Sequence, residues 1–307
     1  MLSNIFIAIS ITLMYSAPLA LAAMGGVISE RSGVVNIGIE GMMSIGALAG
    51  ATVGYFSGNA WLGLFCAGIA GGLLSLLHAI ASITFRADQT VSGIALNLIG
   101  PGLAMFLSRH FFNGATLSLP VPNKLPKVLD SKCLENTMFS NFSIDVTVIL
   151  AAVVVVLVWF LLYKTKWGLR IRAMGEHPAA VDTVGVSVYK SRYFCVILSG
   201  ILAGLGGGAV TLAIISQFTP TAISGQGFIA LAAVIFGKWR PFGAYLACIL
   251  FGFSQALVVM LGGGAVSVPS TLLAMIPYVL TILMLVLFVG RSSAPKASGI
   301  PYEKGAR

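Results

Sequence analysis

The sequence predicts an all-α integral membrane protein, a polytopic helix bundle with about nine membrane segments, some of them broken or re-entrant. Composition is the first observation, since only 9% of the 307 residues are charged, 58% are hydrophobic and the mean hydropathy is +0.98. A soluble domain has roughly 25% charged residues, so this chain cannot cover itself with a surface suited to water. The second observation is that apolar runs longer than about 18 residues recur along the chain.

The expected membrane segments cover residues 2–24, 34–56, 60–84, 90–112, 144–163, 193–215, 220–237, 241–262 and 268–290. The first resembles a signal peptide but lacks a basic beginning, because the first positive residue is Arg31, so an uncleaved helix is expected. The seventh contains Pro220 and Gly225, and its continuous apolar part, 228–236, is too short to span. Such irregular backbone survives at membrane depth only where protein or a cavity surrounds it.

Lysine and arginine predict the orientation, because they gather on the cytoplasmic side of membrane proteins. They are concentrated in the connection 164–192 and in the basic tail 291–307, which are both expected in the cytoplasm. The loop 113–143 then lies outside, with the N-terminus outside and the C-terminus inside. The net charge of +9 therefore indicates membrane orientation rather than nucleic-acid binding.

Small residues recur every four positions in three segments, a spacing that lets helix backbones approach closely in lipid. These stripes are Gly46, Gly50 and Gly54; Gly68 and Gly72; and Gly200, Gly204 and Gly208. They predict a compact bundle.

Polar residues within the apolar runs are candidate pathway residues. Helical spacing would place Asn36, Glu40 and Ser44 on one face of segment 34–56. Glu40 could fix helix packing through hydrogen bonds, line a pathway near its cytoplasmic gate, or contact a ligand. Pro101 would free the carbonyl of Asn97, which then either contacts a ligand or is satisfied by a neighbouring helix.

Other functional classes are poorly supported by the residues present. An ion-coupled transporter would favour paired intramembrane acids, but Glu40 is the only acidic residue clearly inside a segment. A membrane enzyme would need clustered catalytic groups, and the three histidines lie far apart in sequence. The four cysteines show no zinc spacing, so neither a catalytic nor a metal site is expected. No phosphate-loop motif occurs, so any ATP must bind to another chain.

The connection 164–192 has the features of a short exposed helix. Pro178 suits a first helical turn, Glu176 would favour the positive helix N-terminus, and Gly185 can end the helix. A short cytoplasmic helix of this kind is suited to docking into a groove on a partner protein.

The sequence resembles the permease subunits of bacterial ABC importers for branched-chain amino acids, simple sugars and nucleosides. Four segments resemble the nucleoside-type branch, in its order and spacing, over about residues 10–290. They are "SERSGVVNIGIEGMMSIGALAGA", "ADQTVSGIALNLIGPG", "GLRIRAMGEHPAAVDTVGV" and "GQGFIALAAVIFGKWRPFGA".

The resemblance implies one permease domain over residues 1–307 in the cytoplasmic membrane, the shorter of two different permeases that form the pathway. It implies that separate ATPase subunits bind ATP and magnesium, and that an extracytoplasmic lipoprotein delivers the substrate. The coupling helix that docks on the ATPase would comprise Gly175, Glu176, His177, Pro178, Ala179 and Ala180. The loop 113–143 either contacts the binding protein or is a variable solvated loop.

The resemblance favours nucleosides of the purine type as substrate, with simple sugars or a flavin-type vitamin such as riboflavin as alternatives. The sparse intramembrane charge suits a polar, uncharged ligand. Gln89, Asn97 and Gln255 could hydrogen-bond it, and Phe228 could stack on its ring.

Overall fold

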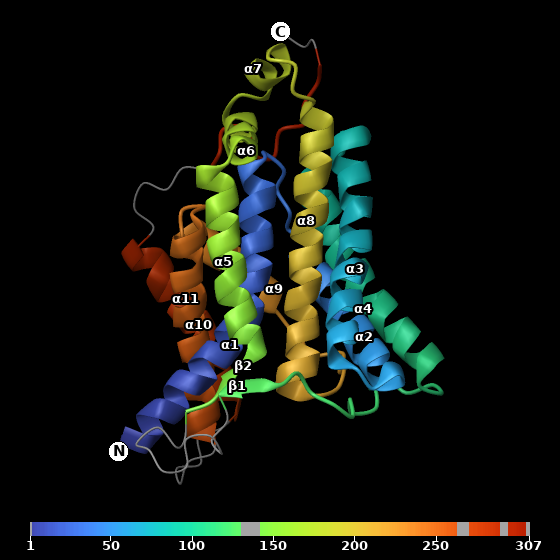
Figure 1. Cartoon of the computed structure of the whole chain (residues 1–307), viewed down its shortest axis with the longest axis vertical. Helices are drawn as coiled ribbons and strands as arrows, with labels where there is room; N and C mark the ends of the chain where they lie inside the picture. Colours follow the sequence, from blue (N-terminus) through green and yellow to red (C-terminus); the bar gives the residue numbers. More distant parts are fainter. Residues whose placement is uncertain (1, 130–141, 263–269, 289–293, 305–307) are drawn as a thin grey trace.

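The computed structural model describes residues 2–129, 142–262, 270–288 and 294–304. The described elements run in the order α1 (Leu2–Arg31), α2 (Ile39–Ser57), α3 (Ala60–Ala79) with η1 (Ile80–Thr84), α4 (Gln89–Phe111), β1 (Lys127–Leu129), β2 (Ile144–Asp145), α5 (Val146–Lys164), α6 (Lys166–Glu176), α7 (Pro178–Thr183), α8 (Val188–Ala209) with η3 (Val210–Ile215), α9 (Gln226–Phe236), α10 (Pro241–Gly262) and α11 (Ser270–Phe288). The π-helical turns η1 and η3 continue α3 and α8. Figure 1 shows α6, α7 and the last described residues at one end of the bundle, called the α7 end below, and the N-terminus at the opposite end.

Six helices of the described chain are long and apolar enough to cross a membrane. They are Ile5–Arg31, Ala60–Thr84, Gln89–Phe111, Val146–Lys164, Val188–Ile215 and Pro241–Gly262. The nine expected segments are therefore confirmed only in part, since 34–56, 220–237 and 268–290 have no counterpart among these six. Helix α2 begins only at Ile39, and α9 is 11 residues long. Part of segment 268–290 lies outside the described residues.

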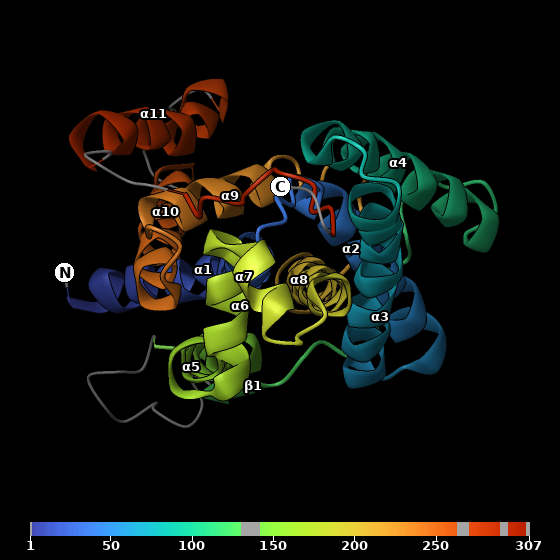
Figure 2. The ribbon, with the colours of Figure 1, turned by 90° about the horizontal axis from the view of Figure 1, so that it is seen from above.

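Helix α8 forms the centre of the bundle and packs against α1, α2 and α3 (Figure 2). Glycines bring these helices together. A Cβ atom at Gly46 of α2 would collide with the backbone of Gly204 in α8, and one at Gly71 of α3 with the backbones of Gly200 and Gly204. The close helix packing expected from the glycine stripes is therefore confirmed.

The seventh segment crosses the bundle as an irregular stretch followed by a half-length helix. Helix α8 with η3 ends at Ser216, whose φ is +71° and whose carbonyl accepts a hydrogen bond from Val121 N at 2.8 Å. Residues 216–225 are not helical, and α9 begins at Gln226. After α9, the carbonyl of Trp239 accepts a 2.9 Å hydrogen bond from Nε of Arg31, at the α7 end. The break expected around Gly225 is present.

Candidate functional site

The connection between α1 and α2 is not helical, and side chains from helices distant in sequence form hydrogen bonds with it. Gln89 Oε1 accepts a 2.7 Å hydrogen bond from Val35 N, and Nε2 of His78 lies 2.9 Å from the carbonyl of Val35. Asn36 Nδ2 donates to Ser199 Oγ at 2.9 Å. The expectation that Asn36 shares a helical face with Glu40 and Ser44 is wrong, because Asn36 precedes the first helical residue.

Asn97 of α4 completes this arrangement. Its Oδ1 accepts a 3.0 Å hydrogen bond from Gly41 N, and its Nδ2 donates to the carbonyl of Ile37 at 2.9 Å. The side-chain amide of Asn97 is therefore satisfied by the neighbouring segment, which it fixes at the start of α2, and the role of Asn97 in contacting a ligand stays a prediction. Two buried polar atoms nearby, Asn36 Oδ1 and Gln89 Nε2, have no hydrogen-bond partner within the described residues.

Glu40 joins the start of α2 to the start of α9. It is the second residue of α2 and only 8% exposed. Its two carboxylate oxygens accept 2.7 Å hydrogen bonds from the backbone N–H groups of Gly225 and Gly227. Gly227 must be glycine for this approach, since a Cβ there would lie 2.5 Å from the Cα of Glu40. Ser44 Oγ donates to the carbonyl of Glu40 at 2.9 Å within α2.

The contact with Glu40 changes the electrostatics of the broken helix. The first N–H groups of a helix lack internal partners and form a ready site for an anion. Here the side chain of Glu40 accepts these hydrogen bonds and therefore occupies the position that an anionic ligand would take.

A cavity of about 360 Å³ lies beside this break. Its walls come from α1, the segment before α9, α9 itself, α10 and α11, and none of its lining residues is charged. The lining residues are Tyr15, Thr221, Ala222, Ile223, Ser224, Gln226, Ile229, Gln255, Val258, Pro277 and Tyr278. The cavity combines amides, hydroxyls and two phenol rings, which suits a ligand that is polar, uncharged and partly aromatic.

The structure separates the predicted site residues into groups. Gln255 lines the cavity, whereas Asn36, Glu40, Gln89 and Asn97 hold the starts of α2 and α9. Phe228 lies in the first turn of α9, is 50% exposed and does not line the cavity. The roles of these residues in a pathway remain predictions.

Several lining residues were missed by sequence reasoning. Tyr15 and Tyr278 lie in long apolar runs, where no motif or spacing distinguishes them from packing residues. Thr221 and Ser224 adjoin Pro220 and Gly225, so the predicted break could have drawn attention to them.

The predicted coupling segment forms two helices at the α7 end. Helix α6 begins after Thr165, whose Oγ1 accepts a hydrogen bond from Gly168 N at 3.0 Å, and it ends at Glu176. Pro178 is the first residue of α7, as predicted. However, Gly175 and Glu176 belong to α6 rather than to α7. The reason is that His177 adopts a φ of −143°, which is not helical, and so separates α6 from α7. Glu176, His177, Ala179 and Ala180 are exposed, whereas Gly175 is buried.

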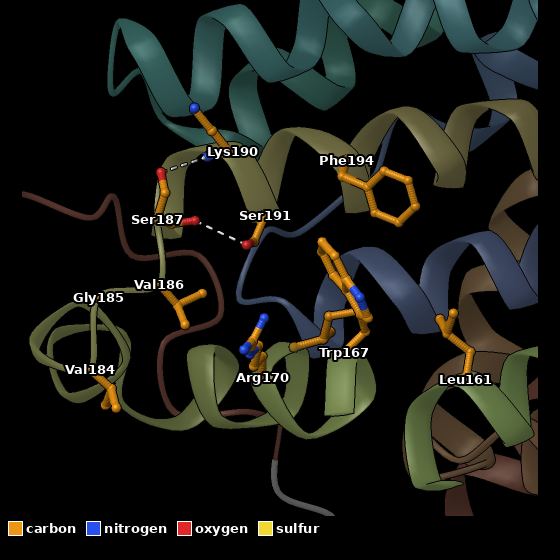
Figure 3. A pocket seen from close by; sticks show the side chains of 11 residues that line it. Leu161, Trp167, Arg170, Val184, Gly185, Val186, Ser187, Lys190, Ser191 and Phe194 are labelled. Atoms are coloured by element: carbon orange, nitrogen blue, oxygen red, sulfur yellow. Dashed lines mark hydrogen bonds between the residues drawn. The ribbon is translucent and has the colours of Figure 1, made fainter. Parts of the chain in front are cut away.

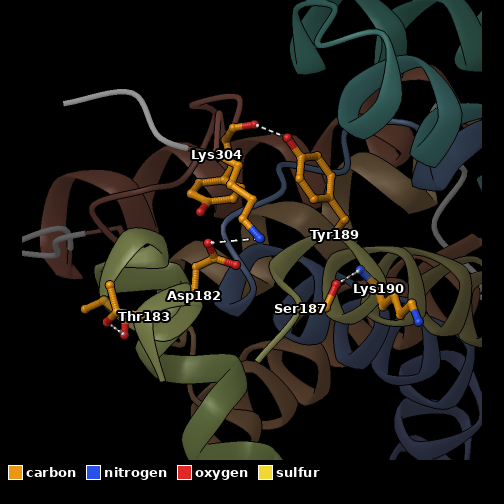
Figure 4. A network of polar contacts seen from close by, with 8 residues as sticks. Asp182, Thr183, Ser187, Tyr189, Lys190 and Lys304 are labelled. Atoms are coloured by element: carbon orange, nitrogen blue, oxygen red, sulfur yellow. Dashed lines mark hydrogen bonds and ion pairs between the residues drawn. The ribbon is translucent and has the colours of Figure 1, made fainter. Parts of the chain in front are cut away.

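The basic tail lies across the α7 end in its described part. Ala297 N donates to the carbonyl of Gly175 at 2.8 Å, which joins the tail to the end of α6. Lys304 Nζ lies 3.8 Å from a carboxylate oxygen of Asp182 in α7, and Tyr189 in α8 donates to the carbonyl of Tyr302 (Figure 4). Residues 294–304, called the strap below, therefore connect α6 and α7 to α8.

The geometry defines a membrane bundle with a broken helix, an uncharged cavity beside the break, and a pair of exposed short helices at one end. The model of the family "Branched-chain amino acid transport system / permease component" matches residues 8–289, and the chain belongs to this family. As predicted, it is a multi-pass transport component and not an enzyme.

Curated relatives cover nearly the whole chain. The guanosine ABC transporter permease protein NupQ of Bacillus subtilis (strain 168) is 48% identical over 310 residues, which are 96% of this chain and 96% of the relative. The nucleoside ABC transporter permease protein NupC of Lactococcus lactis subsp. cremoris (strain MG1363) is 43% identical over 309 residues, 95% of each chain.

A second guanosine permease of Bacillus subtilis is also similar. This protein, NupP, is 27% identical over 251 residues, 78% of this chain and 70% of NupP. Relatives of this chain thus occur as a pair in one organism, which supports the prediction of a second permease partner.

Proposed function

We propose that this chain is the shorter permease subunit of an ATP-driven importer of nucleosides. Its principal support is the uncharged cavity at the broken helix, lined by amides, hydroxyls and phenol rings. Because Glu40 already occupies the N-terminus of α9, the site would not favour an anionic ligand such as a nucleotide. A nucleoside offers hydroxyls and a flat base, and the names of NupQ and NupC point to the same class.

The proposed assembly contains a second, different permease, a separate ATPase that binds ATP and magnesium, and an extracytoplasmic substrate-binding lipoprotein. The α7 end faces the cytoplasm in this proposal, with the N-terminus outside. The charges support it, since residues 164–192 and the strap lie together at that end (Figure 1).

We further propose that α2, α9 with its preceding irregular stretch, and α11 complete nine membrane segments. A half-length helix continued by irregular backbone is compatible with a membrane where protein surrounds it. The packing of α9 against α1 and α10 provides such surroundings. Asn36 and Gln89 keep a proposed pathway role because each has a buried polar atom without a partner among the described residues.

Replacing Gln255 by alanine is expected to reduce guanosine uptake about tenfold, because the loss of one buried hydrogen bond of about 1.4 kcal/mol corresponds to that factor. Uptake should be measured in proteoliposomes containing the complete transporter, at a fixed concentration of the loaded binding protein. Val259→Ala is the matched control, since Val259 lies on the same helix and is exposed but outside the cavity.

Substrate class is tested with the unaltered transporter in the same assay. Unlabelled nucleosides should compete with guanosine, whereas guanosine monophosphate, ribose and riboflavin should not. Competition by ribose or riboflavin alone would assign the transporter to one of the other substrate classes. Equal uptake by the Gln255→Ala and Val259→Ala variants would contradict the role of the cavity.

Changing the exposed face of the coupling helices is expected to uncouple the ATPase. Glu176→Lys combined with Ala179→Trp should lower substrate-stimulated ATP hydrolysis at least fivefold, because both side chains are exposed and would meet the partner directly. Membrane insertion should be unaffected for the same reason. Lys238→Glu, an exposed charge change elsewhere at the α7 end, is the control. Normal stimulation in the double variant would place the ATPase contact elsewhere.

A further inference from the structure

A groove of about 640 Å³ lies at the α7 end, between the α5–α6 corner and the start of α8. Its lining residues are Leu161, Trp167, Arg170, Ile171, Val184, Gly185, Val186, Ser187, Lys190, Ser191 and Phe194. Figure 3 shows Trp167 and Phe194 facing each other across the groove, with Leu161 beyond Trp167. The ring centroids of Trp167 and Phe194 are 6.4 Å apart.

The groove extends from the water-facing end of the bundle into the apolar part. Leu161 belongs to the apolar helix α5, and Phe194 lies six residues after the start of α8, which is about 9 Å along the helix axis. Phe194 and Trp167 are 50% and 57% exposed. Tryptophan is enriched where membrane and water meet, because its ring is apolar and its N–H is polar.

The upper part of the groove is positively charged. Arg170 points into the space between α6 and α8 in Figure 3, and its guanidinium carbon lies 6.0 Å from the centre of the Trp167 ring. Lys190 is exposed at the rim, at the start of α8 on the other wall, and Figure 3 shows its side chain turned away from Arg170. None of the lining residues is acidic, and the ion pairs of the described chain, Arg86 with Glu303 and Lys304 with Asp182, do not include these two cations.

We propose that this groove binds the headgroup of an anionic phospholipid from the cytoplasmic leaflet. Arg170 would contact its phosphate, Lys190 would join it after rotation of its side chain from the position in Figure 3, and an acyl chain would lie along Leu161 and Phe194. Basic pockets at this level between membrane helices suit anionic headgroups, because a cation near the membrane surface attracts an anionic lipid.

The depth of the groove favours a lipid over a docked protein. A cytoplasmic subunit would approach the rim at Val184 and Lys190, whereas Leu161 and Phe194 lie further along the apolar helices α5 and α8. A free phosphate would use only the charged rim and would leave the apolar walls without a role. A lipid matches both the charged rim and the apolar walls.

The test is native mass spectrometry of the intact transporter complex, extracted in mild detergent and titrated with phosphatidylglycerol or phosphatidylcholine. Unaltered protein should retain phosphatidylglycerol at least fivefold more than phosphatidylcholine, and an excess of glycerol 3-phosphate should not displace it. The pair Arg170→Gln and Lys190→Gln should abolish this preference while the ATPase subunit stays bound. The conservative pair Arg170→Lys and Lys190→Arg should keep it.

The matched control is Lys238→Gln with Lys296→Gln, two exposed cations at the α7 end that do not line the groove. An unchanged lipid preference in the Arg170 and Lys190 glutamine pair would overturn the proposal. So would loss of the ATPase with retained lipid, which would make the groove a protein contact. Displacement by glycerol 3-phosphate would show a phosphate site without a role for the acyl chain. Loss of both lipid and ATPase, with no recovery in the conservative pair, would also count against it.

Discussion

Replacing Gly204 by leucine is expected to prevent assembly of the bundle. Gly204 lies in α8 where α2 and α3 both approach, and its added Cβ alone would collide with the carbonyl oxygen of Ala67. Because the obstacle is helix backbone, whole helices must separate. Overpacking usually costs about 1–3 kcal/mol, and a collision between backbones should exceed that range. Fluorescence-detected size-exclusion chromatography of detergent extracts should show less than about a tenth of the normal monodisperse peak.

Gly102→Leu is the control for this experiment. Gly102 lies in α4, and no atom lies within 4 Å of a Cβ placed there. The same increase in side-chain size should therefore leave the peak unchanged. A normal elution profile for Gly204→Leu would show that α8 does not pack against α2 and α3 as described.

Substitution of Glu40 is expected to have the second largest effect. Alanine would leave the N–H groups of Gly225 and Gly227 without their acceptor, and each unsatisfied buried donor costs about 1–3 kcal/mol. Glutamine would keep one acceptor oxygen but place an NH₂ group against the other N–H, so its effect should be intermediate. Thermal unfolding of the purified transporter should give the order wild type, Glu40→Gln, Glu40→Ala.

Ser44→Ala provides the matched control, because Ser44 is equally buried on the same helix and donates only within α2. Comparison with uptake then separates the roles of Glu40. Normal uptake by a destabilised Glu40→Gln variant would assign Glu40 to packing. Reduced uptake at normal stability would assign it to the pathway. Thermal stability of Glu40→Ala equal to that of Ser44→Ala would contradict the importance of the contact with α9.

The sequence predicted those features that depend on a single local property, such as hydropathy, glycine spacing or the position of a proline. Hydropathy located the long helices, and the spacing of Gly46, Gly200 and Gly204 indicated their close contacts. The proline rule placed Pro178 at the start of a helix. In each case the deciding information lies within a few helical turns of the residue concerned.

The start of α2 could not be predicted in the same way. Hydropathy continues through residues 34–38, but the backbone there is not helical, because Gln89, Asn97 and His78 satisfy its polar groups. These partners are 43 to 60 positions away in sequence. Similarly, only the folded chain shows that Glu40 contacts the start of α9, 185 and 187 residues later.

The strap has a consequence for the synthesis of the protein. Residues 294–304 follow every described membrane helix, so the ribosome releases them after the helices have been made. Yet they contact Gly175 at the end of α6 and Asp182 in α7. The surface proposed for the ATPase is therefore completed only late in translation, and a product shortened before the strap would expose an unfinished surface to its partner.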